Sequence, residues 1–124
     1  MAWDNDPRDQ IAEIYEDDFG GLLRAFGLHG LTSLVLKTPV DTGRLRGGWA
    51  ITIGRASDAN STRLDKAGSS TISSGKTQIA NANFGDVLIL QNNVEYGIFI
   101  NDGTPRIRPH RMVERTADEL QNLF

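Results

Sequence analysis

Two short motifs contain residue types that could carry out chemistry. The triplet Asp-Thr-Gly at residues 41–43 matches the triplet of dimeric aspartic proteases, in which two aspartates meet across the dimer axis and share one proton. In those enzymes a hydrophobic strand leads into the triplet and a small residue follows it, whereas here Lys-Thr-Pro stands at 37–39 and Arg44 follows. The expected hydrophobic-hydrophobic-Gly segment near the C-terminus is also missing. A three-residue match is weak, so the protease is kept only as an alternative.

The second motif, Gly-Lys-Thr at residues 75–77, resembles the end of a phosphate-binding P-loop. That loop needs a glycine where Ser70 stands, and no apolar strand leads into it, so a flexible Gly/Ser loop is the favoured interpretation. The two histidines, His29 and His110, are far apart in the chain and have no Asp/Glu ligand pattern around them. We therefore expect no metal site.

The elements that would position these residues begin with a helix predicted over residues 7–37. Asp6 is a suitable N-cap and Pro7 fits the first helical position. A straight helix of this length would be about 45 Å long, and each interior glycine costs about 1 kcal/mol. We therefore expect a bend or break at a glycine, with Pro39 ending the segment. The large apolar residues recur every three or four positions: Ile11, Ile14, Tyr15, Phe19, Leu22, Leu23, Phe26, Leu31, Leu34 and Val35.

Residues 40–44 then have the composition of a tight turn, and alternation over residues 49–53 predicts a half-buried strand. Residues 54–77 contain few large apolar side chains, which is typical of a long flexible loop, with part of it forming a hairpin arm near 69–80.

Three further elements are predicted after this loop. They are a strand at 86–91 that is covered on both faces, a short helix at 94–101 ended by Gly103, and an amphipathic C-terminal helix. The predicted fold is α+β, a single domain over residues 1–124 in which the long helix packs on a small antiparallel sheet.

Composition narrows the class of protein. The chain has 124 residues, no cysteine and a net charge of −3, which is typical of one domain made in a reducing compartment. Residues 1–20 contain seven acids and one arginine, whereas residues 104–115 contain four arginines and one acid. Segregated charge of this kind favours docking between unlike surfaces over bulk nucleic-acid binding.

The longest run of large apolar residues, 87–90, is too short to span a membrane, and the N-terminus does not have the pattern of a secretory signal. A soluble protein is expected.

Two segments carry a resemblance to a known family. Residues 38–49 read Thr-Pro-Val-Asp-Thr-Gly-Arg-Leu-Arg-Gly-Gly-Trp, and residues 92–104 read Asn-Asn-Val-Glu-Tyr-Gly-Ile-Phe-Ile-Asn-Asp-Gly-Thr. In this order they resemble the tail-completion, or head–tail joining, family of tailed bacteriophages. That family pairs a Pro-Val-Asp-Thr-Gly-Arg-Leu-Arg turn with an Asn-x-x-x-Tyr-Ala-x-x-x-Glu-x-Gly-Thr element, and shares the long first helix and the closing helix. Here Gly97 replaces the usual alanine, and Asn101 or Asp102 stands where a glutamate is common.

The resemblance implies a structural protein of the virion neck that is assembled in the host cytoplasm. It implies a homo-oligomeric ring, expected to be a hexamer, between the head-side connector or stopper and the tail terminator and tail tube, with DNA passing through the lumen without specific binding. It implies no catalysis, no cofactor and no membrane. A tail terminator ring is the nearest alternative, and a nucleic-acid binder with a basic loop is an alternative from another class.

Two sets of residues follow from these arguments. Asp41 and Gly43 are expected to hold the turn, with Trp49 and Tyr96 packed in the core beside it, and Asn92 and Gly103 are expected to bound the short helix. The residues expected at a ring or partner interface are arginines: Arg44, Arg46, Arg106, Arg108 and Arg111.

Overall fold

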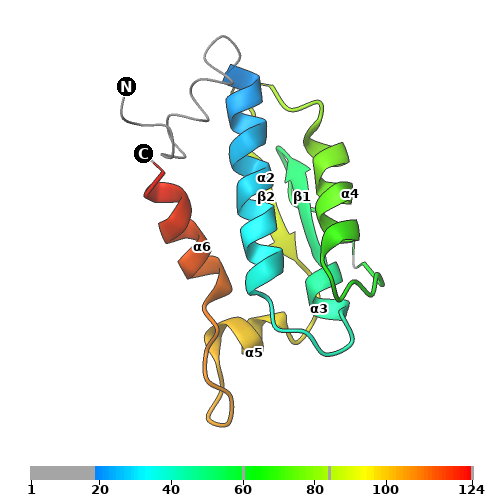
Figure 1. Ribbon diagram of the computed structural model, residues 1–124, viewed down its shortest axis with the longest axis vertical. Coiled ribbons are helices and arrows are strands. Elements are labelled where there is room, and N and C mark those ends of the chain that lie inside the picture. The colour runs from blue at the N-terminus through cyan, green and yellow to red at the C-terminus, as the bar shows by residue number, and fades with distance from the viewer. Residues whose placement is uncertain (1–18, 60, 84, 124) are drawn as a thin grey trace.

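The computed structural model describes residues 19–59, 61–83 and 85–123. Its elements are α2 (Phe19–Lys37), α3 (Arg44–Gly47), β1 (Trp49–Ile53), α4 (Ser69–Ile79), β2 (Leu88–Asn92), α5 (Gly97–Asp102) and α6 (Met112–Gln121). Strands β1 and β2 pair antiparallel, with Trp49 opposite Asn92 and Ile53 opposite Leu88. Helix α2 lies against this sheet with α4 on one side and α6 on the other, as Figure 1 shows. The chain is therefore an α+β protein with a long first helix.

Helix α2 runs without interruption from Phe19 to Lys37, so the expected break at a glycine is wrong for this part of the helix. The glycines instead let the sheet come close. A Cβ atom at Gly27 would lie 2.6 Å from Leu88 Cδ1, and one at Gly30 would lie 2.8 Å from Leu90 Cδ1. The predicted start of the helix, residues 7–18, lies outside the described residues.

The core lies between α2, the sheet and α4. Trp49 and Ile51 are buried and alternate along β1, as predicted, and the indole N–H of Trp49 donates to Thr38 Oγ1 at 2.7 Å. Every residue of β2 is partly exposed, so the expectation that both its faces are covered is wrong. Among the described residues the sheet has two strands, so β2 pairs with β1 alone. The buried core residues are Leu31, Leu34, Val35, Leu45, Trp49, Ile51, Ile79, Val94 and Met112.

The segment predicted as a flexible loop or hairpin arm contains a helix, α4. The arm expected near residues 69–80 is therefore wrong, and the described residues of the irregular connection are 54–59 and 61–68. Thr71, Gly75 and Ile79 recur every four residues along α4 and form its buried side. A Cβ atom at Gly75 would collide with Leu31 Cδ2 of α2, so this glycine allows two helices to pack closely. The Gly-Lys-Thr motif lies within this helix and forms no phosphate-binding loop.

Helices α5 and α6 match the two helices predicted at the C-terminal end. Glu119 of α6 accepts hydrogen bonds from Lys37 Nζ at 2.5 Å and Ser33 Oγ at 2.9 Å, and its Oε1 lies 3.1 Å from His29 Nε2. The hydrogen bond from Lys37 is the main reason why the pKa of Glu119 lies below its ordinary value. This cluster attaches α6 to α2. Among the helices described, none is long and apolar enough to cross a membrane.

Candidate functional site

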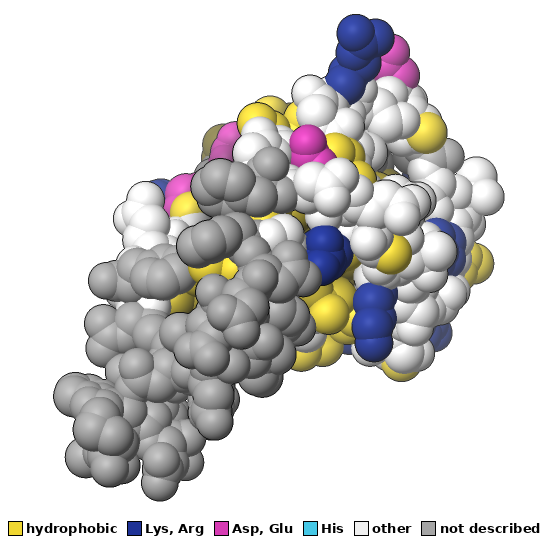
Figure 2. Space-filling model, turned by 90° about the horizontal axis from the view of Figure 1, so that it is seen from above, with side chains coloured by type: hydrophobic (Ala, Val, Ile, Leu, Met, Phe, Trp, Pro, Cys, Tyr) yellow, Lys and Arg dark blue, Asp and Glu magenta, His cyan; other side chains and the backbone are white. Residues whose placement is uncertain are grey.

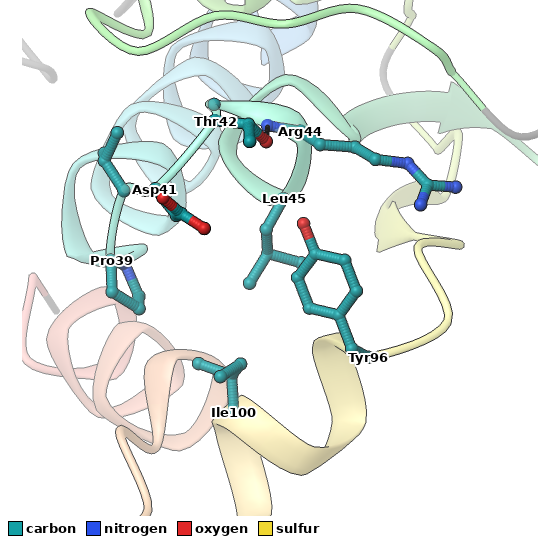
Figure 3. A pocket seen from close by; sticks show the side chains of 9 residues that line it. Pro39, Asp41, Thr42, Arg44, Leu45, Tyr96 and Ile100 are labelled. Carbon is teal, nitrogen blue, oxygen red and sulfur yellow. Dashed lines mark hydrogen bonds between the residues drawn. The ribbon is translucent and has the colours of Figure 1, made fainter.

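The two segments that carry the family resemblance meet at the end of the molecule where α2 ends. Helices α3 and α5 and residues 103–111 all lie at this end in Figure 1. Residues 39–45 line an open pocket of about 500 Å³ together with Tyr96 and Ile100. In the view of Figure 3, Leu45 and Tyr96 appear next to each other, with Ile100 below them and Asp41 to their left. Residues more than 50 positions apart in the sequence thus build one site.

Gly43 fixes the turn on one side of this pocket. Its φ of 89° lies in the left-handed region that favours glycine, and a Cβ atom there would lie 2.7 Å from the backbone nitrogens of Asp65 and Lys66. Thr42 Oγ1 accepts a hydrogen bond from the N–H of Arg44 at 3.3 Å. The Asp41 side chain is exposed and has no hydrogen-bond partner among the described residues. The expectation that Asp41 holds the turn is therefore corrected, because Thr42 and Gly43 take that role.

Asn92 ties the two segments together. Its side-chain Nδ2 donates to the carbonyl oxygen of Leu45 at 2.7 Å, and its Oδ1 accepts from the N–H of Val94 at 3.0 Å. Sequence reasoning gave Asn92 a local role before the short helix. The structure adds a contact with α3, which a sequence pattern does not reveal because the two partners are 47 positions apart.

Asp65 is a structural residue of this region that the sequence analysis missed. Its side chain is buried and accepts hydrogen bonds from the N–H of Gly68 at 2.9 Å and from the N–H and hydroxyl of Thr71, both at 2.7 Å. Burial by itself would raise the pKa of Asp65, but the hydrogen bonds from Thr71 and Gly68 outweigh it, so the pKa lies below its ordinary value. The available signal was an aspartate just before a glycine and a polar run, the composition of a helix start.

Arg46 is partly exposed and is held by hydrogen bonds within the molecule. Its guanidinium donates to the carbonyl oxygens of Lys66 at 2.7 Å and Thr38 at 2.8 Å, and to that of Leu36 at 3.4 Å. These bonds close the turn against the end of α2, and the interface role expected of Arg46 stays a prediction. The Arg44 side chain extends away from the pocket (Figure 3) and remains partly exposed.

The other three arginines lie on the extended connection between α5 and α6. Arg106 and Arg108 are exposed, and they make no ion pair with any described residue. The Arg111 side chain is 62% exposed, with its Nε 3.9 Å from Glu114 Oε2. Gly103 starts this connection with a φ of 81°, and a Cβ atom there would lie 2.8 Å from Pro109 Cδ. Gly103 therefore allows the connection to fold back on itself.

Large apolar side chains are exposed on the same elements. Tyr96 is 38% exposed and faces the pocket, which corrects the expectation that it packs in the core. Ile98 is 63% exposed and Phe99 is 54% exposed, although both belong to a helix. We name this end the α5 surface, defined by its exposed apolar residues Tyr96, Ile98, Phe99, Ile107 and Val113 and by Arg106, Arg108 and Arg111.

A groove of about 330 Å³ lies beside α5. Trp49, Leu90 and Met112 contribute to its apolar walls, and the exposed Ile98 and Val113 also line it. In Figure 2, which looks down on the opposite end of the molecule, the visible Lys and Arg side chains stand apart from one another, mostly among white atoms. Apolar side chains and arginines together are typical of protein-binding surfaces.

The described residues contain no group of three or more His, Cys, Asp or Glu side chains that could hold a metal ion. What the arrangement offers chemically is an apolar surface with guanidinium groups beside it, suited to binding carboxylates and apolar side chains of another protein. Comparison with protein-family models, with curated proteins and with solved structures gives no match for this chain.

Proposed function

We propose that this protein is a structural component of the neck of a tailed bacteriophage, assembled in the host cytoplasm, where it completes the tail and joins it to the head-side connector. The observation that carries the proposal is the convergence of residues 38–45 and 92–103 on one surface. These are the segments that resemble the head–tail joining family, and in this chain they build a site together.

The character of the α5 surface supports an assembly role. Ile98, Phe99 and Val113 are each about half exposed or more, and contiguous apolar surface on a monomer is typical of a protein-binding site. The proposed partners are further copies of the chain in a ring, a hexamer by the resemblance, and the stopper, tail terminator and tail tube proteins above and below it.

The test is to inactivate the gene in its phage and examine the lysate by electron microscopy. Separate filled heads and full-length tails are the expected result, and a plasmid copy of the gene should restore infectious particles. Overlong or ragged tails would instead identify a tail terminator, the nearest alternative. Normal infectious particles without the gene product would contradict both assignments.

A further inference from the structure

We propose that the acidic residues 1–18 of one copy bind the α5 surface of a second copy, so that copies associate head to tail. This inference rests on the self-assembly in the proposed function, and it names the two surfaces that meet.

The α5 surface supplies cations beside exposed apolar side chains. Arg106 and Arg108 are exposed, and Ile107 between them is 39% exposed. The acids of residues 98–115 are Asp102 and Glu114, and Glu114 already accepts a hydrogen bond from Asn101 at 2.7 Å. Four arginines therefore stand against two acids over residues 98–115. An apolar centre with charges beside it is the usual composition of a protein interface.

Residues 1–18 have the complementary composition. They contain seven acids and one arginine, a charge of −6, in a chain of net charge −3, so residues 19–124 carry +3. Apolar residues recur among the acids at Ile11, Ile14 and Tyr15. Carboxylates match the guanidinium groups of the α5 surface, and the apolar residues match its exposed side chains and the groove of about 330 Å³ beside α5.

The points of attachment favour a contact between copies. Residues 1–18 join the chain at Phe19, where α2 begins, whereas the α5 surface lies at the end where α2 stops. A helix of 19 residues is about 28 Å long, so the two partners are attached at opposite ends of the molecule. A contact between two different patches of identical subunits repeats from copy to copy and closes into a ring or extends as a filament. The geometry thus provides one interface that suffices for a multi-subunit assembly.

A charge swap on the purified full-length chain tests this contact. The double variant R106E/R108E should weaken self-association roughly tenfold or more in sedimentation velocity at low salt, because repulsion replaces attraction. The variant D9R/E13R should weaken it similarly, and the two double substitutions combined in one chain should restore it. The matched control R55E/K76E reverses two exposed charges elsewhere and should associate as the wild type does. A wild type that stays monomeric at every concentration, or unchanged association of R106E/R108E, would overturn the proposal.

A cross-link shows directly whether the contact joins two copies. The chain has no cysteine, so single cysteines can be placed without interference. A mixture of D9C and I107C chains should form a disulfide-linked dimer under mild oxidation, because each chain supplies one half of the contact. A mixture of D9C with R55C, whose new thiol is exposed away from the α5 surface, should form much less. Equal yields from the two mixtures would contradict the contact.

The outcomes separate this inference from the proposed function. If the contact forms between purified chains but phage without the gene assembles normally, the neck assignment is wrong and the contact stands. If loss of the gene leaves heads and tails separate but R106E/R108E restores infectious particles as well as the wild type does, the contact is wrong and the neck assignment stands.

Discussion

At the scale of single residues, the carbonyl oxygen of Gly43 accepts hydrogen bonds from the N–H of Gly47 at 2.8 Å and of Asp65 at 3.0 Å. One backbone group thereby connects the turn at the pocket to α3 and to the connection that leads into α4. The approach of Asp65 leaves no room for a side chain at Gly43, and the left-handed φ disfavours one.

Replacing Gly43 with alanine tests both effects, because Gly54 provides a matched control. Gly54 also has a positive φ, of 80°, but a Cβ atom there would meet nothing within 4 Å. We expect Gly54→Ala to lower the free energy of unfolding by about 1–2 kcal/mol, the cost of the left-handed conformation. Gly43→Ala should cost about 1–3 kcal/mol more, because the new methyl group forces the backbone apart. Urea unfolding followed by circular dichroism measures both, and equal losses would contradict the crowding.

The sequence could predict the role of some residues of the site but not of others. The need for a glycine at position 43 follows from the composition of the turn. The role of Asp41 does not, because a short acidic side chain can either accept local amide bonds or point to solvent, and here it is exposed. Tyr96 was misplaced for a similar reason, since an aromatic residue fits both a core and a pocket wall.

At the scale of elements, α4 is the helix that the local sequence pattern predicted least well, since its residues were expected to form a loop or hairpin arm. Six of its eleven residues are serine or threonine, which have modest helix propensity. The helix is stabilised by partners outside it: Asp65 accepts bonds from its first turn, and Leu31 of α2 packs on Gly75. By contrast, β1 and α6 could be predicted because their large apolar residues carry the period of the element, and α5 because turn residues precede it and Gly103 follows it. The break predicted at the glycines of α2 is wrong because a glycine can either interrupt a helix or let a neighbouring element pack closely against it.

Asp65→Asn tests how far α4 depends on its buried carboxylate. The substitution keeps the shape but replaces one acceptor oxygen with an amide group that faces the N–H of Thr71. We expect the free energy of unfolding at neutral pH to fall by about 1.5–3 kcal/mol, the usual size for hydrogen bonds to a charged group. Asp58→Asn, at an exposed position, should change it by less than about 0.5 kcal/mol.

The same variant should change the pH dependence of stability. The pKa of Asp65 is lowered in the folded state, so its contribution is full above the unfolded pKa of about 3.9. The contribution is lost as the pH falls through the lowered folded pKa, because both states then bind the proton. The difference between wild type and Asp65→Asn should therefore shrink below about pH 4. A difference that stays constant down to pH 2 would show that the charge of Asp65 is not involved.

At the scale of the whole molecule, the residues of the core and those of the proposed assembly surface are different. The core lies between α2, the sheet and α4, whereas the α5 surface lies at one end. Ile98 and Phe99 are exposed and outside the core cluster. The exposure of Ile98 and Phe99 could not be predicted from the sequence, because a helix of six residues is too short for its spacing to show which side is buried.

Replacing both Ile98 and Phe99 should change assembly without changing stability. We expect Ile98→Ser with Phe99→Ser to change the free energy of unfolding by less than about 1 kcal/mol, because surface substitutions seldom do more. The same chain should fail to restore infectious particles to phage that lacks the gene. Leu64→Ser with Val87→Ser is the matched control, since those side chains are 66% and 62% exposed on other segments. Full infectivity of the Ile98 and Phe99 variant would show that this surface is not used in assembly.

The burial of Trp49 gives the molecule an optical reporter of its own. The chain has two tryptophans, so the substitution Trp3→Phe leaves a single indole as the fluorophore. Trp49 is 5% exposed, lines the groove beside α5 and donates its N–H to Thr38. Its emission therefore reports both the loss of the core, as a shift to longer wavelength, and the arrival of a side chain in that groove. Folding and association can thus be followed by intrinsic fluorescence in one sample, without an attached dye.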